Sequence, residues 1–262
     1  MSEIDPFIDE GVRARIQAEL DRIEETQQVR ILLAVESGSR AWRFASPDSD
    51  YDVRFLYVRP LDEYLRIGEP RDVIERPLDA VLDINGWDLR KALQLMMKSN
   101  AVLLEWLTSP VRYRGDAGFC ARLLDLAREA AYLPAFAFHY DRVAQRAWAP
   151  GEDEIRLKSY FYALRPALAL RWMRARRSAP PMDLPQLRAG AGLSDALNEA
   201  IDRLLALKAR SGEAATIPRV PVIEAFLAEA LQIPASPEGA PDRREIRLRA
   251  DALFRDTARL IG

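Results

Sequence analysis

The sequence predicts an α+β protein, in which a small domain with a β-sheet precedes an all-helical domain. Short apolar runs bounded by turn residues are typical of strands, and they occur only in the first part of the chain. Beyond about residue 115, apolar residues recur at helical spacing, and Pro and Gly separate the helical segments. We therefore expect two domains, residues 1–115 and residues 116–262.

Composition narrows the class of protein. A chain of 262 residues can form one large or two modest domains with hydrophobic cores. Charged residues make up 30% of it, no apolar run reaches the roughly 20 residues of a membrane helix, and the acidic N-terminus is unlike a signal peptide. One cysteine and one histidine exclude a disulfide framework and His-pair metal sites. We expect a cytoplasmic protein with no membrane partner.

The formal net charge of -2 predicts no general attraction to nucleic acid, so a site for a polyanion must be a local basic patch. Residues 156–177 are one candidate, because they contain seven basic residues and no acidic one. The alternative is a solvated basic face beside an aromatic core, which we favour for Arg174 to Arg177.

Five elements are expected before residue 79. A helix from Phe7 to about Glu25 shows apolar residues at helical spacing, and the apolar run Val29 to Val35 predicts a buried strand. After a polar loop, a second strand is expected from Asp50 to Val58, then a short helix from Leu61 to Ile67 and a segment at residues 72–75 that could pair with the sheet.

A third strand is expected from Asp79 to Ile84, closed by a turn at Asn85-Gly86, and a helix from Asp88, which is its N-cap or an acid of its first turn. Helices are then expected at Ala101–Leu107, Phe119–Tyr132, Ala135–Trp148, Glu154–Arg177, Ser194–Ser211, Val220–Leu231 and Arg243–Ile261. Pro166 should kink the fourth of these, because it removes a hydrogen bond.

Two acids flank Tyr51 in the second strand. Asp50 and Asp52 project from one face, because successive side chains of a strand alternate. Like charges this close repel and require protons or a divalent cation. Gly38-Ser39, at the end of the preceding strand, can approach a ligand closely and donate backbone N–H groups to phosphate oxygens. Metal and phosphate together indicate phosphoryl or nucleotidyl transfer.

Nucleotidyl transfer requires a third carboxylate to activate the attacking hydroxyl. Two Mg²⁺ ions would lie roughly 3.5–4 Å apart in such a site. Asp83, on the next strand, is the first choice, followed by Asp79 on the same face and then Asp88, which helix capping already explains. Arg54 continues the face of Asp50 and Asp52, and pairing with a carboxylate is favoured over phosphate binding.

Gly38-Ser39, ten intervening residues and then Asp50-Tyr51-Asp52 resemble the signature of the polymerase-β-like nucleotidyltransferase superfamily. Three longer segments are similar to predicted nucleotidyltransferases associated with RNA ligases in bacterial RNA-repair gene neighbourhoods: GSRAWRFASPDSDYDVRFLYVRP, DINGWDLRKAL with EWLTSP, and KSYFYALRPALALRW. The loop departs from the family at Arg43, where a second glycine is usual, so the backbone is expected to be less free there and a charge is added near the phosphates.

The resemblance implies a small mixed-sheet, palm-like domain capped by a helical domain. The metal (Mg²⁺, with Mn²⁺ an alternative) would be held by Asp50, Asp52 and Asp83. The nucleotide would be bound by Gly38, Ser39, Arg40, Lys158 and Arg165. It also implies an NTP donor, ATP first among them, and RNA as one acceptor, with small molecules and proteins left open. A regulatory module that binds nucleotides without turnover, and a protein-modifying transferase, are the alternatives.

Overall fold

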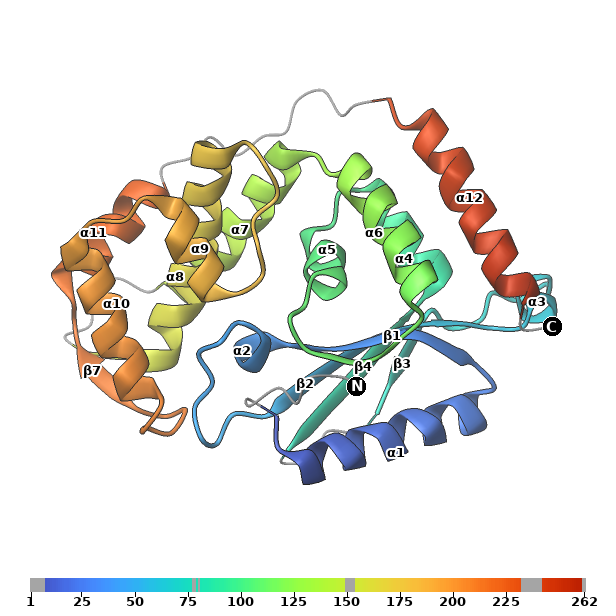
Figure 1. Cartoon of the computed structure of the whole chain (residues 1–262), viewed down its shortest axis with the longest axis horizontal. Coiled ribbons are helices and arrows are strands. Elements are labelled where there is room, and N and C mark those ends of the chain that lie inside the picture. Colours follow the sequence, from blue (N-terminus) through green and yellow to red (C-terminus); the bar gives the residue numbers. More distant parts are fainter. Residues whose placement is uncertain (1–7, 77–78, 80, 149–153, 232–241, 261–262) are drawn as a thin grey trace. The chain divides into compact units, whose positions relative to one another are not determined.

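The computed structural model describes residues 8–76, 79, 81–148, 154–231 and 242–260. It confirms the α+β class: a five-stranded mixed sheet is combined with helices that make up most of the chain (Figure 1). In this part of the chain, no helix is both long enough and apolar enough to span a bilayer.

Two compact units divide the chain. The first consists of Met1–Arg40, Asp50–Ala131 and Asp242–Gly262, and the second of Ala41–Ser49 and Tyr132–Pro241. This division differs from the predicted boundary at residue 115, because the first unit also takes in a helix after that residue and another near the end of the chain. Residues Ala41–Ser49, most of the loop between Gly38-Ser39 and Asp50, belong to the second unit.

The sheet lies in the first unit. Its strands are β1 (Arg30–Ser37), β2 (Tyr51–Val58), β3 (Val73–Glu75), β4 (Leu82–Asp88) and β5 (Arg112–Gly115). They lie in the order β3-β4-β2-β1-β5; β2 and β4 are parallel, and the other neighbours are antiparallel. The expected strands at Val29–Val35, Asp50–Val58 and residues 72–75 correspond to β1, β2 and β3.

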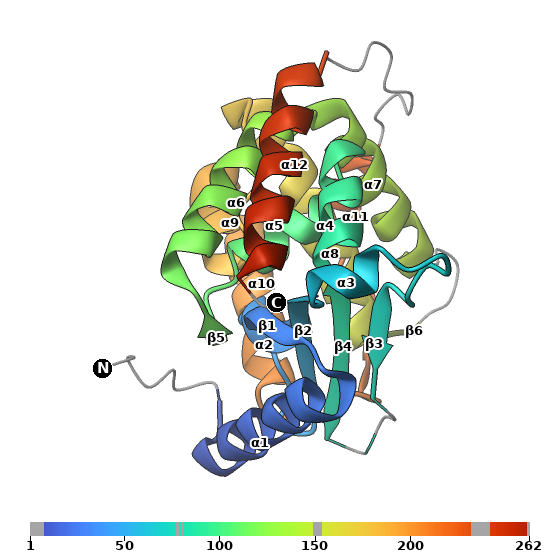
Figure 2. The ribbon, with the colours of Figure 1, turned by 90° about the vertical axis from the view of Figure 1, so that its right-hand side faces the viewer.

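Helices cover both faces of this sheet (Figures 1 and 2). On one face, buried residues of α1 (Glu10–Gln27) pack with alternate residues of β2, such as Val53 and Phe55. Packed against the sheet from the other side are α4 (Leu89–Met97), α5 (Ala101–Leu107) and α6 (Ala117–Ala130). Helix α12 (Arg244–Arg259) packs on α4 and α6, while α3 (Leu61–Tyr64) follows β2.

The second unit is mainly helical. It contains α7 (Leu133–Ala147), α8 (Leu157–Arg176), α9 (Leu184–Ala191), α10 (Asp195–Lys208) and α11 (Pro221–Ala230). Helix α8 is its core, with Tyr160, Phe161 and Leu164 fully buried. Pro166 lies inside α8, whose range is continuous, and the kink expected there stays a prediction.

Three expectations about these elements are wrong. Asn85-Gly86 is no turn, because β4 runs through both residues, and a side chain at Gly86 would lie 2.2 Å from the Phe55 ring. Strand β4 begins at Leu82 and not at Asp79, whose carboxylate accepts 2.7 Å hydrogen bonds from the backbone of Val81 and Leu82. The region after residue 115 is not purely helical, since β6 (Glu154–Arg156) pairs with β7 (Thr216–Pro218).

Candidate active site

Gly38 lies where β1 ends beside β2. Ser37, the last residue of β1, is the antiparallel partner of Asp52. Gly38 has a φ of +61°, and a Cβ on it would lie 1.9 Å from Oδ2 of Asp52. Only glycine leaves room for that carboxylate and adopts this backbone freely. Residues Gly38–Ala41 form the short helix α2, in which Ser39 is buried.

Asp52 and Asp83 lie side by side. They are partners in the parallel pair β2–β4, so their side chains leave the same face of the sheet. Nη2 of Arg54 is 2.8 Å from Oδ1 of Asp52 and 2.6 Å from Oδ2 of Asp83. Its Nη1 donates to the Asp83 carbonyl at 2.9 Å. The pairing of Arg54 with a carboxylate is therefore confirmed, and one cationic nitrogen joins the two acids.

Asp50 lies outside this pair. It precedes β2 and is exposed, and its carbonyl accepts a 3.1 Å hydrogen bond from Nε of Arg40. The guanidinium of Arg40 lies over the Tyr51 ring, 3.8 Å from its centroid. Among the described residues, no three His, Cys, Asp or Glu side chains are grouped so that they could hold a metal ion. The role of Asp50 as a metal ligand stays a prediction.

The two alternatives to Asp83 lie elsewhere. Asp79 is exposed and pairs with Arg15, and backbone N–H groups of Leu82 and Val81 lower its pKa. Asp88 is at the other end of β4, where it caps α4 by accepting from the backbone of Arg90 at 2.8 Å. Burial raises the pKa of Asp88. The geometry therefore favours Asp83, the only one of the three beside Asp52.

Sequence reasoning missed Glu36. Its side chain is completely buried, Oε1 accepts the backbone N–H of Asp52 at 2.9 Å, and Oε2 accepts the hydroxyl of Tyr113. Burial raises the pKa of Glu36 to about 8. Glu36 thus fixes the backbone of Asp52 from β1. An acid at the end of an apolar strand, two residues before Gly38, is the signal that could have indicated it.

Lys158 and Arg165 belong to the second unit. Nζ of Lys158 is 2.7 Å from Oε2 of Glu213. The guanidinium of Arg165, only 5% exposed, donates to the Met182 carbonyl at 3.0 Å and lies 4.5 Å from the centroid of the Trp42 ring. Their contact with nucleotide phosphates stays a prediction.

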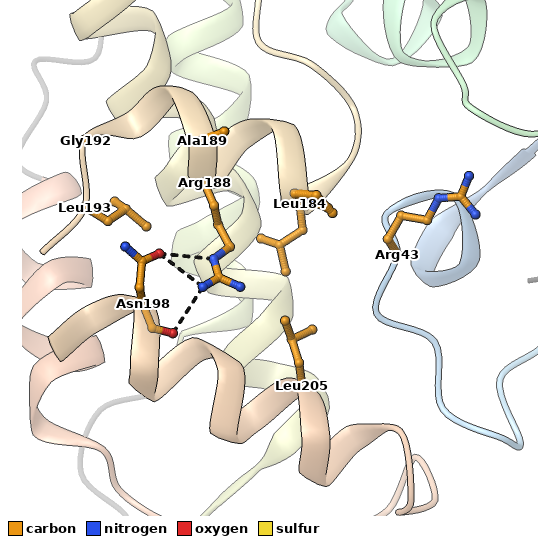
Figure 3. A pocket seen from close by; sticks show the side chains of 9 residues that line it. Arg43, Leu184, Arg188, Ala189, Gly192, Leu193, Asn198 and Leu205 are labelled. Carbon is orange, nitrogen blue, oxygen red and sulfur yellow. Dashed lines mark hydrogen bonds between the residues drawn. The ribbon is translucent and has the colours of Figure 1, made fainter. Parts of the chain in front are cut away.

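Arg43 has a φ of +68°, the left-handed conformation that glycine adopts without strain. The loop therefore takes the backbone shape that a glycine would allow, although Arg43 stands there. Arg43 also lines a cavity of about 520 Å³ in the second unit, together with Leu184 and Arg188. Figure 3 shows the guanidinium of Arg43 pointing away from Arg188, which donates a hydrogen bond to Oδ1 of Asn198.

Comparison with known proteins identifies the family. Residues 12–256 match the model of the RNA repair pathway DNA polymerase beta family. YcgL, an uncharacterized protein of Bacillus subtilis (strain 168), is 43% identical over 219 residues, which are 82% of this chain and 84% of YcgL. A crystal structure of a nucleotidyltransferase-like protein from Exiguobacterium sibiricum 255-15 aligns with 94% of this chain and 75% of its own, at a TM-score of 0.32 and 10% identity, which is too low to establish a shared fold. Because the family model spans nearly the whole chain, the protein belongs to the RNA repair pathway DNA polymerase beta family, as the resemblance of its Gly-Ser and Asp-x-Asp motifs implied.

Proposed function

We propose that this protein is a Mg²⁺-dependent nucleotidyltransferase that moves a nucleoside monophosphate from an NTP to a hydroxyl group at an RNA end and releases pyrophosphate. ATP is the first donor to test. The observation that carries the proposal is the pair Asp52 and Asp83, whose carboxylates converge on one cationic nitrogen next to Gly38. Membership of a polymerase-β family supports nucleotidyl transfer as the reaction class.

The carboxylates of Asp52 and Asp83 are suitable ligands for the metal. Carboxylate oxygens are preferred ligands of Mg²⁺, and the negative charge of these two carboxylates is already balanced in part by a cation, the guanidinium of Arg54. Asp52 and Asp83 would hold the metal, with Asp50 joining from the residue before β2. Bound Mg²⁺, or Mn²⁺, would stabilise negative charge on the phosphates and lower the pKa of the attacking hydroxyl.

Phosphate binding, alignment of the reacting atoms and proton transfer are assigned to residues of the chain. The backbone at Gly38 and the groups of Ser39 and Arg40 would bind the phosphates and hold the α-phosphorus in line with the hydroxyl. The hydroxyl oxygen forms a bond to the α-phosphorus, the bond from that phosphorus to the bridging oxygen breaks, and pyrophosphate leaves. Asp83 accepts the hydroxyl proton. Lys158 and Arg165 are proposed as further phosphate ligands.

Incubation with α-labelled NTPs, Mg²⁺ and an RNA pool tests the proposal. Label should appear on RNA with release of pyrophosphate, and Asp52→Asn should lower the rate by roughly 10³-fold or more, because charge stabilisation is a major part of phosphoryl transfer. Asp79→Asn, which removes an exposed acid of the same unit, is the matched control and should retain activity.

Other outcomes separate the alternatives. NTP binding without transfer or pyrophosphate release, across RNA, protein and small acceptors, would show a nucleotide-binding regulatory module. Label on a protein band in place of RNA would show a protein-modifying enzyme. As a check that does not depend on turnover, Mg²⁺ should raise the unfolding temperature of the wild type more than that of Asp52→Asn.

A further inference from the structure

A groove in the first unit lies between α4 and α12. Its cavity measures about 670 Å³, with Leu93, Met97 and Phe254 among its apolar lining residues. Lys98, the C-cap residue of α4, and Arg247 of α12 add positive charge to the same lining. The two helices lie side by side in both views of the ribbon (Figures 1 and 2). The groove thus combines an apolar surface with cations from two helices.

The cations of this groove are available to a ligand. Residues 89–98 contain three basic residues and no acidic one. Lys98 and Arg247 are exposed, and neither side chain makes a hydrogen bond or ion pair with the described residues. Arg90 lies over the rings of Tyr64 and Phe254, 4.7 and 5.3 Å from their centroids. Asp251 is the one acid among the described lining residues, so the charge there is net positive.

The basic stretch at residues 156–177 is different, although its composition made it the first candidate for a polyanion site. Five of its seven basic side chains bind groups of the second unit: Lys158 to Glu213, Arg165 to the Met182 carbonyl, Arg171 to Glu229, Arg174 to the Ala230 carbonyl and Arg176 to the Gly190 carbonyl. Their hydrogen-bonding capacity is partly used in holding helices together. In a chain with a net charge of -2, the α4–α12 groove is a better place for a local polyanion site.

We propose that the α4–α12 groove binds single-stranded RNA, with phosphates at Lys98 and Arg247 and a base against Met97 and Phe254. Each nucleotide of an unpaired strand offers a charged phosphate and a flat apolar base, and proteins that bind single strands use basic grooves with aromatic side chains for these two parts. The choice of RNA rests on the proposed function. The binding site itself rests on the geometry and charge of the groove.

Fluorescence anisotropy with a labelled RNA of about 12 nucleotides tests the proposal on the full chain. Each phosphate-binding cation that is removed should reduce the slope of log K against log salt by about 0.7, so Lys98→Gln/Arg247→Gln should reduce it by about 1.4 and weaken binding roughly 10- to 30-fold at about 0.1 M salt. Both side chains are exposed, so the unfolding temperature should be nearly unchanged.

The matched control is Arg122→Gln/Arg255→Gln. It removes the same charge from exposed positions on α6 and α12 outside the groove lining. RNA affinity should fall by less than about threefold in this variant, since only long-range attraction changes. An equal loss in both variants would mean that overall charge drives binding, and the groove proposal would be wrong. Photocrosslinks from 4-thiouridine RNA should map to Met97 or Phe254, and crosslinks confined to other segments would also overturn it.

The groove and the catalytic proposal can fail separately. If the wild type labels RNA but Lys98→Gln/Arg247→Gln binds RNA as tightly as the wild type, the groove proposal is wrong and the enzyme stands. If RNA is never labelled but its binding depends on Lys98 and Arg247, the groove stands and the catalytic function is wrong. If these two residues are needed to bind an acidic peptide but not RNA, the partner is a protein and the proposal is overturned.

Discussion

At the scale of single residues, the carboxylate of Asp52 occupies the space that a side chain at position 38 would need. Gly38→Ala should impair nucleotidyl transfer, because the new Cβ would lie 1.9 Å from Oδ2 of Asp52 and would displace that carboxylate. The backbone adds a cost of about 1–2 kcal/mol for a left-handed non-glycine residue. Activity and the free energy of unfolding should be measured on the same preparations.

Gly192→Ala is the matched control for this prediction. Gly192 has almost the same φ, +62°, but beyond its adjacent residues no atom lies within 4 Å of the position that a Cβ would take there. Both variants should therefore lose similar stability from the backbone, while only Gly38→Ala loses transfer. Equal activity in the two variants would show that Asp52 does not need the space at Gly38.

Glu36 should make the stability of the fold depend on pH. Burial raises its pKa from 4.5 to about 8, so between these values the unfolded chain ionises Glu36 while the folded chain keeps the proton. Because the folded state binds this proton more tightly than the unfolded state, the free energy of unfolding falls as pH rises. Relative to Glu36→Gln, which cannot ionise, the wild type should lose roughly 3–5 kcal/mol between about pH 4.5 and pH 8 and nothing more above.

Urea unfolding of both proteins in EDTA, across this pH range, measures that difference. Titration of other groups is common to both proteins and cancels. A gap between the two unfolding free energies that stays constant with pH would show that Glu36 is ionised in the folded protein at neutral pH.

The sequence predicts that Asp52 and Asp83 share a site, because alternation within a strand, the succession of strands along the chain and the family resemblance all point to them. The structure places the two residues as partners on β2 and β4. For Glu36 the sequence shows only an acid at the end of an apolar strand, because its partners, the backbone N–H of Asp52 and the hydroxyl of Tyr113, are 16 and 77 residues away. The position of Asp50 also depends on where β2 begins, and strand ends are the least certain part of a sequence prediction.

At the scale of elements, β4 shows how packing overrides local turn signals. Asn-Gly is a strong turn signal, yet Gly86 lies within a strand because the Phe55 ring of β2 fills the space beside it. Gly86→Ala should cost about 1–3 kcal/mol, as overpacked cores do. Gly68→Ala, at a position with nothing within 4 Å, should change stability by less than about 0.5 kcal/mol in the same urea titration.

Elements with their own periodicity were predicted well, and those that depend on distant partners were not. Helices α1 and α6 follow their apolar spacing. The short strands β5 and β6 were missed, because three or four residues carry little pattern and each exists only through pairing with a distant strand.

The loop of residues 41–49 is held by contacts that no local pattern could reveal. Nζ of Lys208, which is buried, donates to Oγ of Ser46 at 2.7 Å. Oγ of Ser49 donates to Oε1 of Glu213 at 2.6 Å, and the backbone N–H of Glu213 donates to Asp48. The segment that separates the two halves of the nucleotidyltransferase motif is therefore ordered by side chains from the end of α10 and the turn after it.

At the scale of the whole molecule, the chain builds its two units from interleaved segments. It leaves the first unit after Arg40, returns at Asp50, leaves again after Ala131 and returns at Asp242. A division at a single residue could not describe this arrangement, because apolar residues at helical spacing predict a helix but do not show which core the helix joins. Helix α12 shows the same helical spacing of apolar residues as the helices before it, yet it packs in the first unit.

Removal of residues 242–262 should consequently destabilise the first unit, although the segment contributes nothing to the carboxylate pair. Helix α12 buries Ala250, Leu253 and Ala258, and Arg243 donates to the Met97 carbonyl and to Oγ of Ser99. The loss of this apolar burial and of these bonds should lower the free energy of unfolding by on the order of 3–5 kcal/mol.

Urea unfolding of the truncated chain, followed by circular dichroism and by hydrogen exchange at β2 and β4, measures this loss. The control is the full chain with Arg255→Gln/Arg259→Gln, which removes two exposed charges from α12 and leaves its buried side intact. Protection of β2 and β4 should fall in the truncated chain and persist in the control. Unchanged protection after truncation would mean that α12 is an appendage, and the lining of the α4–α12 groove could then not depend on a fixed position of this helix. Reduced protection would instead show that α12 is part of the core that supports Asp52 and Asp83.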